Sequence, residues 1–338
     1  MSECKIALIG ATGAVGKVFL SILEERNFPA SDIRLCASER SWGKKIKVRG
    51  EEITVEEATT QLMSEVDFVF ISASGSISRQ MAPLAAEQGA IVIDKSSAFR
   101  MDPNVPLVVP EINPGDLHDH NGIIASPNCT TTPMVMALKP LNEANKAKRI
   151  VAASYQSVTG TGAAAGEELL AQSKEVLDGS APSMDVYPHQ IAFNVLPQVE
   201  DFLDNGYTTE EMKMQNESRK ILHAPDLKVS TTCVRVPVMV SHAEAINVEF
   251  TDPISPGEVR EILSDMPGVR VVDDPHANVY PMPVQSEGED DVFVGRIRTD
   301  ISLDNGIAMW LTCDNLRKGA ALNAIQIAEE MLNRDMLQ

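Results

Sequence analysis

The stretch Lys5-Ile6-Ala7-Leu8-Ile9-Gly10-Ala11-Thr12-Gly13-Ala14-Val15-Gly16 decides the fold class of this chain. Its first half is a continuous apolar run, which is typical of a strand buried on both faces of a parallel sheet. Its second half has a glycine at every third position and leads into Val18, Phe19, Ile22 and Leu23, which recur at helical spacing. Glycines at such a turn let the backbone approach a pyrophosphate at the helix N-terminus. We therefore predict a dinucleotide-binding unit here; the alternative is an ordinary strand-to-helix turn.

The rest of the chain extends this pattern and then changes it. Apolar strands at Val66–Ala73 and Ala90–Asp94 alternate with a helical stretch at Arg79–Gln88, which predicts a doubly wound parallel sheet. Beyond about residue 147 the strands alternate polar and apolar residues, and Asp304-Asn305-Gly306 is a hairpin signal between two of them. Such alternation is typical of an antiparallel sheet with one wetter face, and the Pro- and Gly-rich segment Pro275–Glu289 is predicted to be a loop.

These patterns predict an α/β protein with two domains. The first is a Rossmann-type, doubly wound nucleotide domain over residues 1–129, completed by a C-terminal helix at 317–338 that packs back on it. The second is an α+β substrate and dimerisation domain with a mainly antiparallel sheet over residues 130–316. A chain of 338 residues with 43% hydrophobic content is long enough for both.

Composition excludes several classes of partner. The net charge of −19 argues against nucleic acid and against an anionic membrane surface. No run approaches the roughly 18 apolar residues of a membrane span. The five cysteines are scattered and odd in number, and four of them lie in or beside strand-like runs, as buried thiols in a reducing compartment do. We expect a cytoplasmic protein.

The end of the second predicted strand bears on the choice of cofactor. An NAD site needs an acidic residue there, and Glu39 could serve. However, Ser38, Arg40 and Ser41 surround it with groups suited to a ribose phosphate, and a basic residue is notable in so acidic a chain. We expect NADP; the alternative is that Arg40 is simply a solvated residue of a turn.

A single cysteine stands out as a candidate nucleophile. The run Ser126-Pro127-Asn128-Cys129-Thr130-Thr131-Thr132-Pro133 places Cys129 at a turn directly before an apolar helical pattern. Backbone N–H groups and the helix dipole at that position favour the thiolate, which is the nucleophilic form. A nucleophilic thiol in a nicotinamide-binding protein indicates aldehyde or acyl-phosphate redox chemistry.

Several polar residues could assist this thiol. Asn128 adjoins it, and Gln156 ends a strand that runs into a Gly-rich loop, where a neutral amide can orient a carbonyl or a carboxylate. His242 follows an extended run and is a candidate acid or base, although a lone histidine is more often structural. Arg235 on that run could grip a carboxylate through bidentate geometry. Arg100 follows a strand end, where ligands of parallel sheets bind; its alternative is a surface ion pair.

Taken together, the motifs resemble those of the aspartate-semialdehyde dehydrogenase family. The resemblance covers nearly the whole chain in the right order and rests on these segments: Gly10–Gly13, Asp94–Arg100, Val109–Asn113, Ser126–Thr131, Tyr155–Gly160, Arg235–Val238 and Ser241–Glu244. There are two small departures: Ser241 stands where glycine is frequent, and Lys95 stands where asparagine is common.

The resemblance implies a role for individual residues. Cys129 would form an acyl thioester, His242 would be the general acid/base, and Gln156 would orient the substrate. Arg235 would hold the substrate carboxylate and Glu210 its amine. Arg100 and Lys213 would bind phosphate, and Asn128 belongs to the same set of substrate- and phosphate-binding residues. The residues that would line the NADP(H) site are Gly10, Thr12, Gly13, Ala14, Val15, Ser38, Arg40, Ser41, Thr159, Gly160 and Asn315.

The implied reaction is the reversible, NADPH-dependent conversion of L-aspartyl 4-phosphate to L-aspartate 4-semialdehyde and inorganic phosphate, in the biosynthesis of lysine, threonine, methionine and isoleucine. The resemblance also implies a homodimer and no metal. Three alternatives stay open: a related thiol-dependent reductase, such as N-acetylglutamyl-phosphate reductase or a glyceraldehyde-phosphate dehydrogenase; a cysteine hydrolase built on Cys129 and His242; and a non-catalytic NADP-binding sensor.

Overall fold

The structure is a computed structural model that describes residues 3–337 of the chain. These residues form two compact units. Unit 1 contains the chain up to Asn128 together with the part from Ala320 onward, and unit 2 is Cys129–Gly319.

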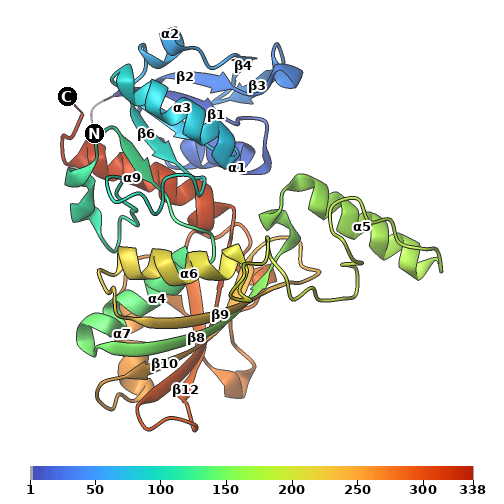
Figure 1. The fold of residues 1–338 in the computed structure, drawn as a ribbon, viewed down its shortest axis with the longest axis vertical. Helices are drawn as coiled ribbons and strands as arrows, with labels where there is room; N and C mark the ends of the chain where they lie inside the picture. Colours follow the sequence, from blue (N-terminus) through green and yellow to red (C-terminus); the bar gives the residue numbers. More distant parts are fainter. Residues whose placement is uncertain (1–2, 338) are drawn as a thin grey trace. The chain divides into compact units, whose positions relative to one another are not determined.

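Unit 1 is built around a seven-stranded sheet with the order β3-β4-β2-β1-β5-β6-β7 (Figure 1). All neighbouring strands pair in parallel except β3 and β4, which form an antiparallel hairpin at one edge. The strands are β1 (Cys4–Ile9), β2 (Ala30–Cys36), β3 (Lys45–Val48), β4 (Glu51–Glu56), β5 (Phe68–Ile71), β6 (Ile91–Asp94) and β7 (Ile123–Ala125).

Helices cover both faces of this sheet, as expected for strands that are apolar throughout. One apolar cluster joins one face to α1 (Ala14–Glu25) and to α9 (Leu322–Asn333), the C-terminal helix. A second cluster joins the other face to α2 (Thr60–Met63) and α3 (Gly75–Glu87). The doubly wound Rossmann-type architecture predicted from the sequence is confirmed.

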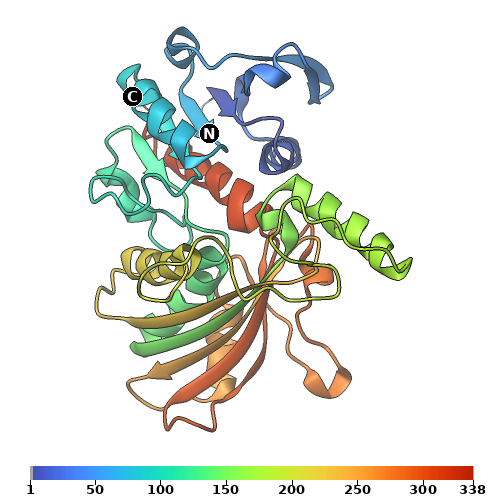
Figure 2. The same ribbon diagram turned by 45° about the vertical axis from the view of Figure 1, so that its right-hand side comes forward.

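Unit 2 contains a six-stranded sheet with the order β11-β12-β13-β10-β8-β9 (Figure 2). The central pairs are antiparallel, whereas β8–β9 and β11–β12 are parallel, so the prediction of a mainly antiparallel sheet is also confirmed. Its strands are β8 (Ala147–Gln156), β9 (Lys228–Arg235), β10 (His242–Phe250), β11 (Val269–Val271), β12 (Val292–Thr299) and β13 (Gly306–Cys313).

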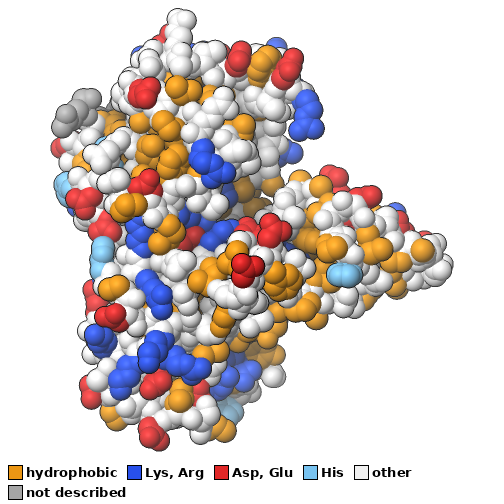
Figure 3. Space-filling model, viewed as in Figure 1, with side chains coloured by type: hydrophobic (Ala, Val, Ile, Leu, Met, Phe, Trp, Pro, Cys, Tyr) orange, Lys and Arg blue, Asp and Glu red, His pale blue; other side chains and the backbone are white. Residues whose placement is uncertain are grey.

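One face of this sheet is covered by three helices. The covering helices are α4 (Thr131–Ala144), α6 (Thr209–Ile221) and α7 (Pro256–Ser264), which lie together on one side in Figure 1. A fourth helix, α5 (Ala163–Leu177), extends away from the sheet within this unit. Figure 3 shows hydrophobic side chains on α5, where Leu170 and Leu177 are exposed. Phe193 and Phe202, in the segment that follows α5 in the sequence, are exposed as well.

Of the two local predictions for unit 2, the structure confirms the hairpin and corrects the loop. The hairpin at residues 304–306 joins β12 to β13, as predicted. The segment 275–289 is not simply a loop, because it contains a 3₁₀ turn (Pro275–Ala277) and the short helix α8 (Pro283–Ser286), each with a proline in its first turn. The other short turns are 3₁₀ at Glu39–Ser41, Pro114–Asp119 and Val158–Gly160, and π-helical at Arg317–Ala321. Among residues 3–337, no helix is both long and apolar enough to cross a membrane.

Candidate active site

One edge of the sheet in unit 2 gathers the polar residues singled out above. Gln156 ends β8 and pairs in register with Arg235, which ends the parallel strand β9. His242 begins β10 and pairs with Cys313, which ends the antiparallel strand β13. Parallel strands end, and antiparallel partners begin, at the same edge. This topology brings residues about 80 positions apart in the sequence together.

Cys129 lies at this edge, two residues before the first residue of α4. Its Sγ atom is 3.3 Å from Nε2 of His242. Gly319 packs against it so closely that a Cβ atom there would lie 3.0 Å from the Cβ atom of Cys129. Cys129 is partly exposed, whereas the other four cysteines, Cys4, Cys36, Cys233 and Cys313, are buried as predicted. Cys129 is therefore the thiol that a substrate can reach.

His242 is almost completely buried, with 1% of its surface exposed. Its Nδ1 atom is 3.0 Å from the backbone nitrogen of Ser157, which donates a hydrogen bond to it, and 3.1 Å from the Ser157 hydroxyl oxygen. Burial, and then the positive charge of Arg235, hold the pKa of His242 well below the ordinary histidine value. The ring is therefore neutral near pH 7.

The Ser157 hydroxyl connects this ring to Asn315. It donates to Asn315 Oδ1 at 3.1 Å, and the same oxygen accepts the backbone N–H of Ser241 at 2.9 Å. Asn315 also donates from Nδ2 to Thr159 Oγ1 at 3.3 Å. Ser241 has a φ of 74°, a left-handed value that favours glycine. This is the position at which the resemblance described above implies that glycine is frequent and this chain has serine.

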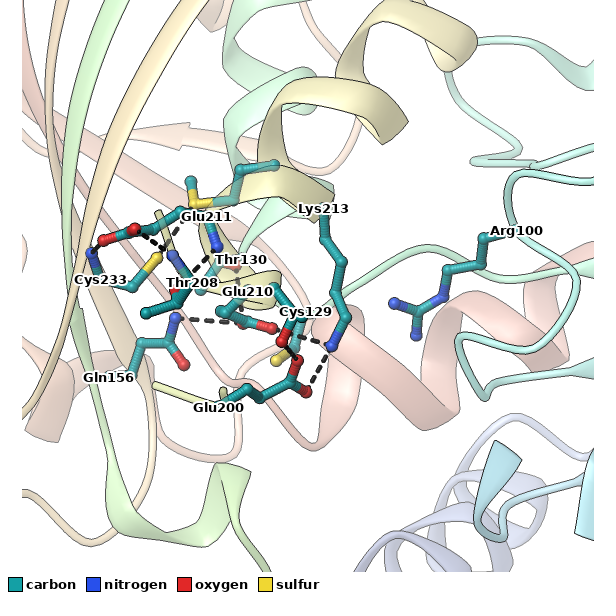
Figure 4. Close-up of polar contacts among 12 residues, drawn as sticks. Arg100, Cys129, Thr130, Gln156, Glu200, Thr208, Glu210, Glu211, Lys213 and Cys233 are labelled. Atoms are coloured by element: carbon teal, nitrogen blue, oxygen red, sulfur yellow. Dashed lines mark hydrogen bonds and ion pairs between the residues drawn. The ribbon is translucent and has the colours of Figure 1, made fainter. Parts of the chain in front are cut away.

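The carboxylate of Glu210 is the second focus of the site (Figure 4). Its Oε1 atom accepts hydrogen bonds from Gln156 Nε2 at 3.2 Å and from Thr130 Oγ1 at 3.4 Å. Its Oε2 atom is 3.2 Å from Nζ of Lys213, which also pairs with Glu200. The arrangement is an acidic cluster in which one lysine is shared between two carboxylates.

Helix α6 holds these groups in place. It begins with a capping box, in which the Thr208 side chain accepts from the N–H of Glu211 and the Glu211 carboxylate accepts from the N–H of Thr208. The Glu211 carboxylate also accepts the backbone N–H of Cys233 on β9, at 2.9 Å. One carboxylate therefore joins the start of the helix to the sheet, and this fixes the neighbouring Glu210.

A glycine leaves room for the arginine and the histidine. A Cβ atom at Gly160 would lie 2.8 Å from Nη1 of Arg235 and 3.1 Å from Cε1 of His242. Nη1 of Arg235 donates to the Ser157 carbonyl oxygen at 2.8 Å. Arg235 Nε is buried and has no hydrogen-bond partner among the described residues. Glycine at position 160 is therefore required by packing at the site.

Two of the predicted substrate residues belong to unit 1. Arg100 is buried and donates from Nε to the Ser126 carbonyl oxygen at 2.9 Å and from Nη2 to the Lys95 carbonyl oxygen at 2.7 Å. Asn128 is buried as well and is the last residue of unit 1 before Cys129. These contacts anchor Arg100 to the backbone that leads to Asn128.

The glycine turn of unit 1 has the geometry of a dinucleotide cradle. A Cβ atom at Gly10 would lie 2.2 Å from the Ser72 carbonyl oxygen, and one at Gly16 would lie 2.3 Å from the Gly10 carbonyl oxygen. Gly13 is the N-cap of α1, and no side chain caps the helix there. The first N–H groups of α1, which begins Ala14-Val15, therefore point toward an open position that suits a phosphate.

The residues predicted to read a ribose phosphate lie beyond β2. Ser38 and Arg40 are exposed, and the Ser41 hydroxyl is 3.5 Å from that of Thr12 in the glycine turn. Lys44 adds a second cation, since its Nζ atom donates to Ser41 Oγ at 3.4 Å. Sequence reasoning had missed Lys44, although its position three residues after Ser41 was a signal.

Other contributors carried no sequence signal of their own. Ser157, Glu200 and Gly319 act through contacts to His242, Lys213 and Cys129, and each of these contacts joins segments that are distant in the sequence. Within residues 3–337, no cluster of histidine, cysteine or acidic side chains could hold a metal ion.

Comparisons with known proteins agree with this architecture. Residues 5–120 match the profile of the semialdehyde dehydrogenase NAD binding domain, and residues 138–318 match that of the semialdehyde dehydrogenase dimerisation domain. The chain is 50% identical over 337 residues to the aspartate-semialdehyde dehydrogenase of Aquifex aeolicus, covering 98% of this chain and 99% of that protein. It is 47% identical over 334 residues to the Bacillus subtilis protein of the same name, covering 96% of each.

Solved structures give the same result. Aspartate semialdehyde dehydrogenase II of Vibrio cholerae, complexed with ASA, superposes with a TM-score of 0.96 at 43% identity, over 98% of this chain and 99% of that one. The Candida albicans aspartate semialdehyde dehydrogenase with NADP superposes with a TM-score of 0.77 at 26% identity, over 99% of each chain. With an NAD(P)-binding domain, a dimerisation domain and relatives that match it along almost its whole length, this chain belongs to the aspartate-semialdehyde dehydrogenase family.

Proposed function

We propose that this protein converts L-aspartyl 4-phosphate to L-aspartate 4-semialdehyde and inorganic phosphate, reversibly and with NADPH. The observation that carries the proposal is the contact of 3.3 Å between Cys129 Sγ and His242 Nε2 at an edge that also holds Gln156, Glu210 and Arg235. The activity would serve the biosynthesis of lysine, threonine, methionine and isoleucine.

The charges at this edge suit an amino acid substrate. Glu210 would bind the amine, because its carboxylate carries the negative charge that an ammonium group needs and is hydrogen-bonded to Gln156. Arg235 would hold the α-carboxylate through the part of its guanidinium that does not bind Ser157. Gln156, which cannot ionise, would orient the substrate without adding a charge, with Asn128 assisting. Lys213 and Arg100 would bind the phosphate.

Cys129 would carry the acyl group between two half-reactions. Its thiolate attacks the acyl carbon of the substrate, a carbon–sulfur bond forms, and the carbon–oxygen bond to phosphate breaks. The phosphate that leaves takes up a proton from solvent. Reduction of the thioester and expulsion of the thiolate then release the aldehyde. His242, which faces the sulfur, would serve as acid/base for the substrate oxygen.

NADP(H) fits the residues of unit 1. The cradle formed by Gly10, Thr12, Gly13, Ala14 and Val15 would hold the pyrophosphate, and Ser38, Arg40, Ser41 and Lys44 would surround the 2′-phosphate. Thr159, Gly160 and Asn315 of unit 2 would contact the nicotinamide end. When bound, the cofactor supplies the hydride. Arg40→Ala is expected to raise KM for NADPH; an unchanged KM would mean that other residues read the 2′-phosphate.

We also propose that the protein is a homodimer. The matched dimerisation domain supports this, and so do the exposed apolar side chains of unit 2, among them Tyr155 on β8 and Leu177 on α5. Sedimentation should give twice the mass of the chain. The cytoplasmic location stays a prediction, supported by five cysteines that form no disulfide.

A spectrophotometric assay tests the reaction directly. L-aspartate 4-semialdehyde, inorganic phosphate and NADP⁺ should yield NADPH, and NAD⁺ should yield less. Cys129→Ala should abolish turnover, and His242→Ala should slow it by roughly 10²–10⁴-fold. A Cys129→Ala variant that still reduces aspartyl phosphate would overturn the thioester mechanism.

The same assay separates the alternatives. N-acetylglutamate semialdehyde or glyceraldehyde 3-phosphate as the better substrate would favour a related reductase. The first has no free amine for Glu210, and the second has neither an amine for Glu210 nor a carboxylate for Arg235. Hydrolysis without NADP⁺ would favour a cysteine hydrolase. NADPH binding without phosphate-dependent turnover would favour a sensor.

A further inference from the structure

The protonation state of His242 can be read from its contacts. The backbone nitrogen of Ser157 lies 3.0 Å from Nδ1, and its N–H points at that atom. A backbone amide can only donate, so Nδ1 must accept. In a neutral imidazole, the nitrogen that does not accept carries the proton, which is therefore on Nε2, facing Cys129.

We infer that the peptide N–H of Ser157 locks His242 in the neutral Nε2–H tautomer, so that the ring donates a hydrogen bond to sulfur and to the substrate oxygen and does not take the proton of the Cys129 thiol. Ser157 is thus a positioning residue. This inference rests on the proposed function only in assigning Cys129 and His242 to the reaction, since the tautomer itself belongs to the protein without substrate.

Contacts at both ring nitrogens fix the orientation of the His242 imidazole. If the ring were turned by a half-rotation, carbon atoms would face the Ser157 amide and the Cys129 sulfur, and both contacts would be lost. In the observed orientation Nδ1 meets the amide at 3.0 Å and Nε2 meets Sγ at 3.3 Å. A Cβ atom at position 160 would lie 3.1 Å from Cε1, so glycine there leaves the ring uncrowded in this orientation.

The Ser157 hydroxyl does not decide the tautomer. Its oxygen lies 3.1 Å from Nδ1 and 3.1 Å from Asn315 Oδ1, and both of these atoms are acceptors in the locked state. A hydroxyl hydrogen rotates to suit either one, whereas the amide hydrogen cannot move. Asn315 Oδ1 is itself fixed as an oxygen, because it accepts the backbone N–H of Ser241.

The charged and titratable surroundings also disfavour a doubly protonated ring. Arg235 at the end of β9 places a positive charge nearby, and burial penalises a second one; both lower the pKa of His242. Other titratable groups near it include Cys129 before α4, Cys313 opposite it on β13, and Glu244 two residues along β10 on the same face. The buried cation Lys318 lies close enough to Cys313 to lower its pKa. The pKa of Cys313 is raised by burial and that of Glu244 by burial and by Glu210, so both stay neutral and offer no counter-charge.

The chemical consequence concerns the proton balance. With Nε2 already protonated, Cys129 loses its thiol proton to solvent, and the resulting thiolate accepts a hydrogen bond from Nε2–H. The same N–H can later stabilise the negative charge that develops on the substrate oxygen, as a neutral histidine donor does in other enzymes. The proton consumed in the aldehyde-forming direction ends on phosphate.

Nuclear magnetic resonance of protein labelled with ¹⁵N in its histidine rings tests the inference without substrate. The chain has six histidines, and the His242→Gln variant identifies the signal of interest. We expect an unprotonated Nδ1 and a protonated Nε2 across the range of about pH 5 to 8 in which histidines ordinarily change charge. A coupling across the hydrogen bond between the Ser157 amide and Nδ1 should also appear. A protonated Nδ1 at pH 7, in a neutral or a doubly protonated ring, would overturn the inference.

Two variants separate the amide from its neighbours. Ser157→Ala keeps the backbone N–H and removes the hydroxyl, so the tautomer should not change; a change would assign control to the hydroxyl and refute the role of the amide. Cys129→Ser replaces sulfur by a group that can donate to Nε2, and the tautomer should again persist. A switch to Nδ1–H in that variant would show that the cysteine sets the tautomer. Because both measurements need no turnover, they stand even if the proposed substrate is wrong.

Discussion

Glu244 on β10 is a buried carboxyl group whose ionisation should limit the stability of the protein at higher pH. It is fully buried, with 0% of its surface exposed, and neither carboxyl oxygen has a hydrogen-bond partner among residues 3–337. Across the sheet it lies opposite Ser154 and Leu311. Burial, and then the charge of Glu210, raise its pKa well above the ordinary value of 4.5. The side chain is therefore a neutral acid in the folded protein.

The sign of the resulting pH dependence follows from proton linkage. Below the pKa of an unfolded glutamate both states hold the proton, and the group gives no slope. Above it the unfolded chain loses the proton while the folded protein keeps it, so the free energy of unfolding falls by about 1.4 kcal/mol per pH unit. The loss continues until pH exceeds the raised pKa of the folded state.

Glu244→Gln removes this loss, because an amide of the same shape cannot ionise. Both side chains are neutral near pH 4.5 and would have similar stability there. From pH 5.5 to 6.5 the variant should gain about 1.4 kcal/mol relative to the parent protein. Groups that titrate identically in both proteins, including other carboxylates, cancel in this difference.

Urea unfolding followed by circular dichroism, at one fixed protein concentration, measures the difference. The concentration must be fixed because the proposed dimerisation would make the apparent stability depend on it. Glu249→Gln is the matched control, since Glu249 lies on the same strand but is partly exposed, and it should show no such slope. A flat difference for Glu244→Gln between pH 5.5 and 6.5 would mean that the buried carboxyl is already ionised, and the reasoning would fail.

Three further predictions follow from the site. Gly160→Ala should lower kcat/KM by about 10²-fold with the fold intact, since its Cβ would lie 2.8 Å from Arg235 Nη1. Gly115→Ala is the control, because no atom lies within 4 Å of a Cβ at that position. Equal activity of the two variants would refute the packing argument. Ser241→Gly should raise the free energy of unfolding by about 1 kcal/mol, because glycine adopts the φ of 74° without the strain of a side chain. Ser241→Ala should give no such gain. An equal gain from both variants would exclude backbone strain as the cause. Iodoacetamide should modify Cys129 fastest, because burial raises the pKa of Cys4 and of Cys36 to about 12 and also raises the pKa of Cys233 and of Cys313. Peptide mapping that finds another cysteine modified equally fast would contradict this.

Much of the fold was predictable because its signals are local. The apolar run of β1, the glycine turn after it and the helical spacing of α1 lie within some 20 consecutive residues, and together they specify a parallel, doubly wound sheet. The hairpin between β12 and β13 was predictable for the same reason, since its turn residues are adjacent. The short helix α8 was missed because prolines, which end helices internally, also start them.

The candidate site was predictable only in part. Cys129 and His242 could be nominated from motifs, but their separation of 3.3 Å depends on the register of four strands. The pairing of Lys213 with Glu200 has no signature in the chain, because it joins segments whose approach is set by packing. In contrast, Glu210 and Lys213 lie three residues apart on α6, and Lys44 lies three residues after Ser41, so the spacing of these two pairs is local.

By itself the sequence determined the order of strands and helices, the glycine turn and the identity of the candidate nucleophile, since these depend on neighbours along the chain. Only the tertiary structure decided that Ser157 donates its N–H to His242 and that Glu244 is sealed from water. Both properties arise where distant strands pair, and there burial and fixed amide hydrogens determine which atoms hold protons.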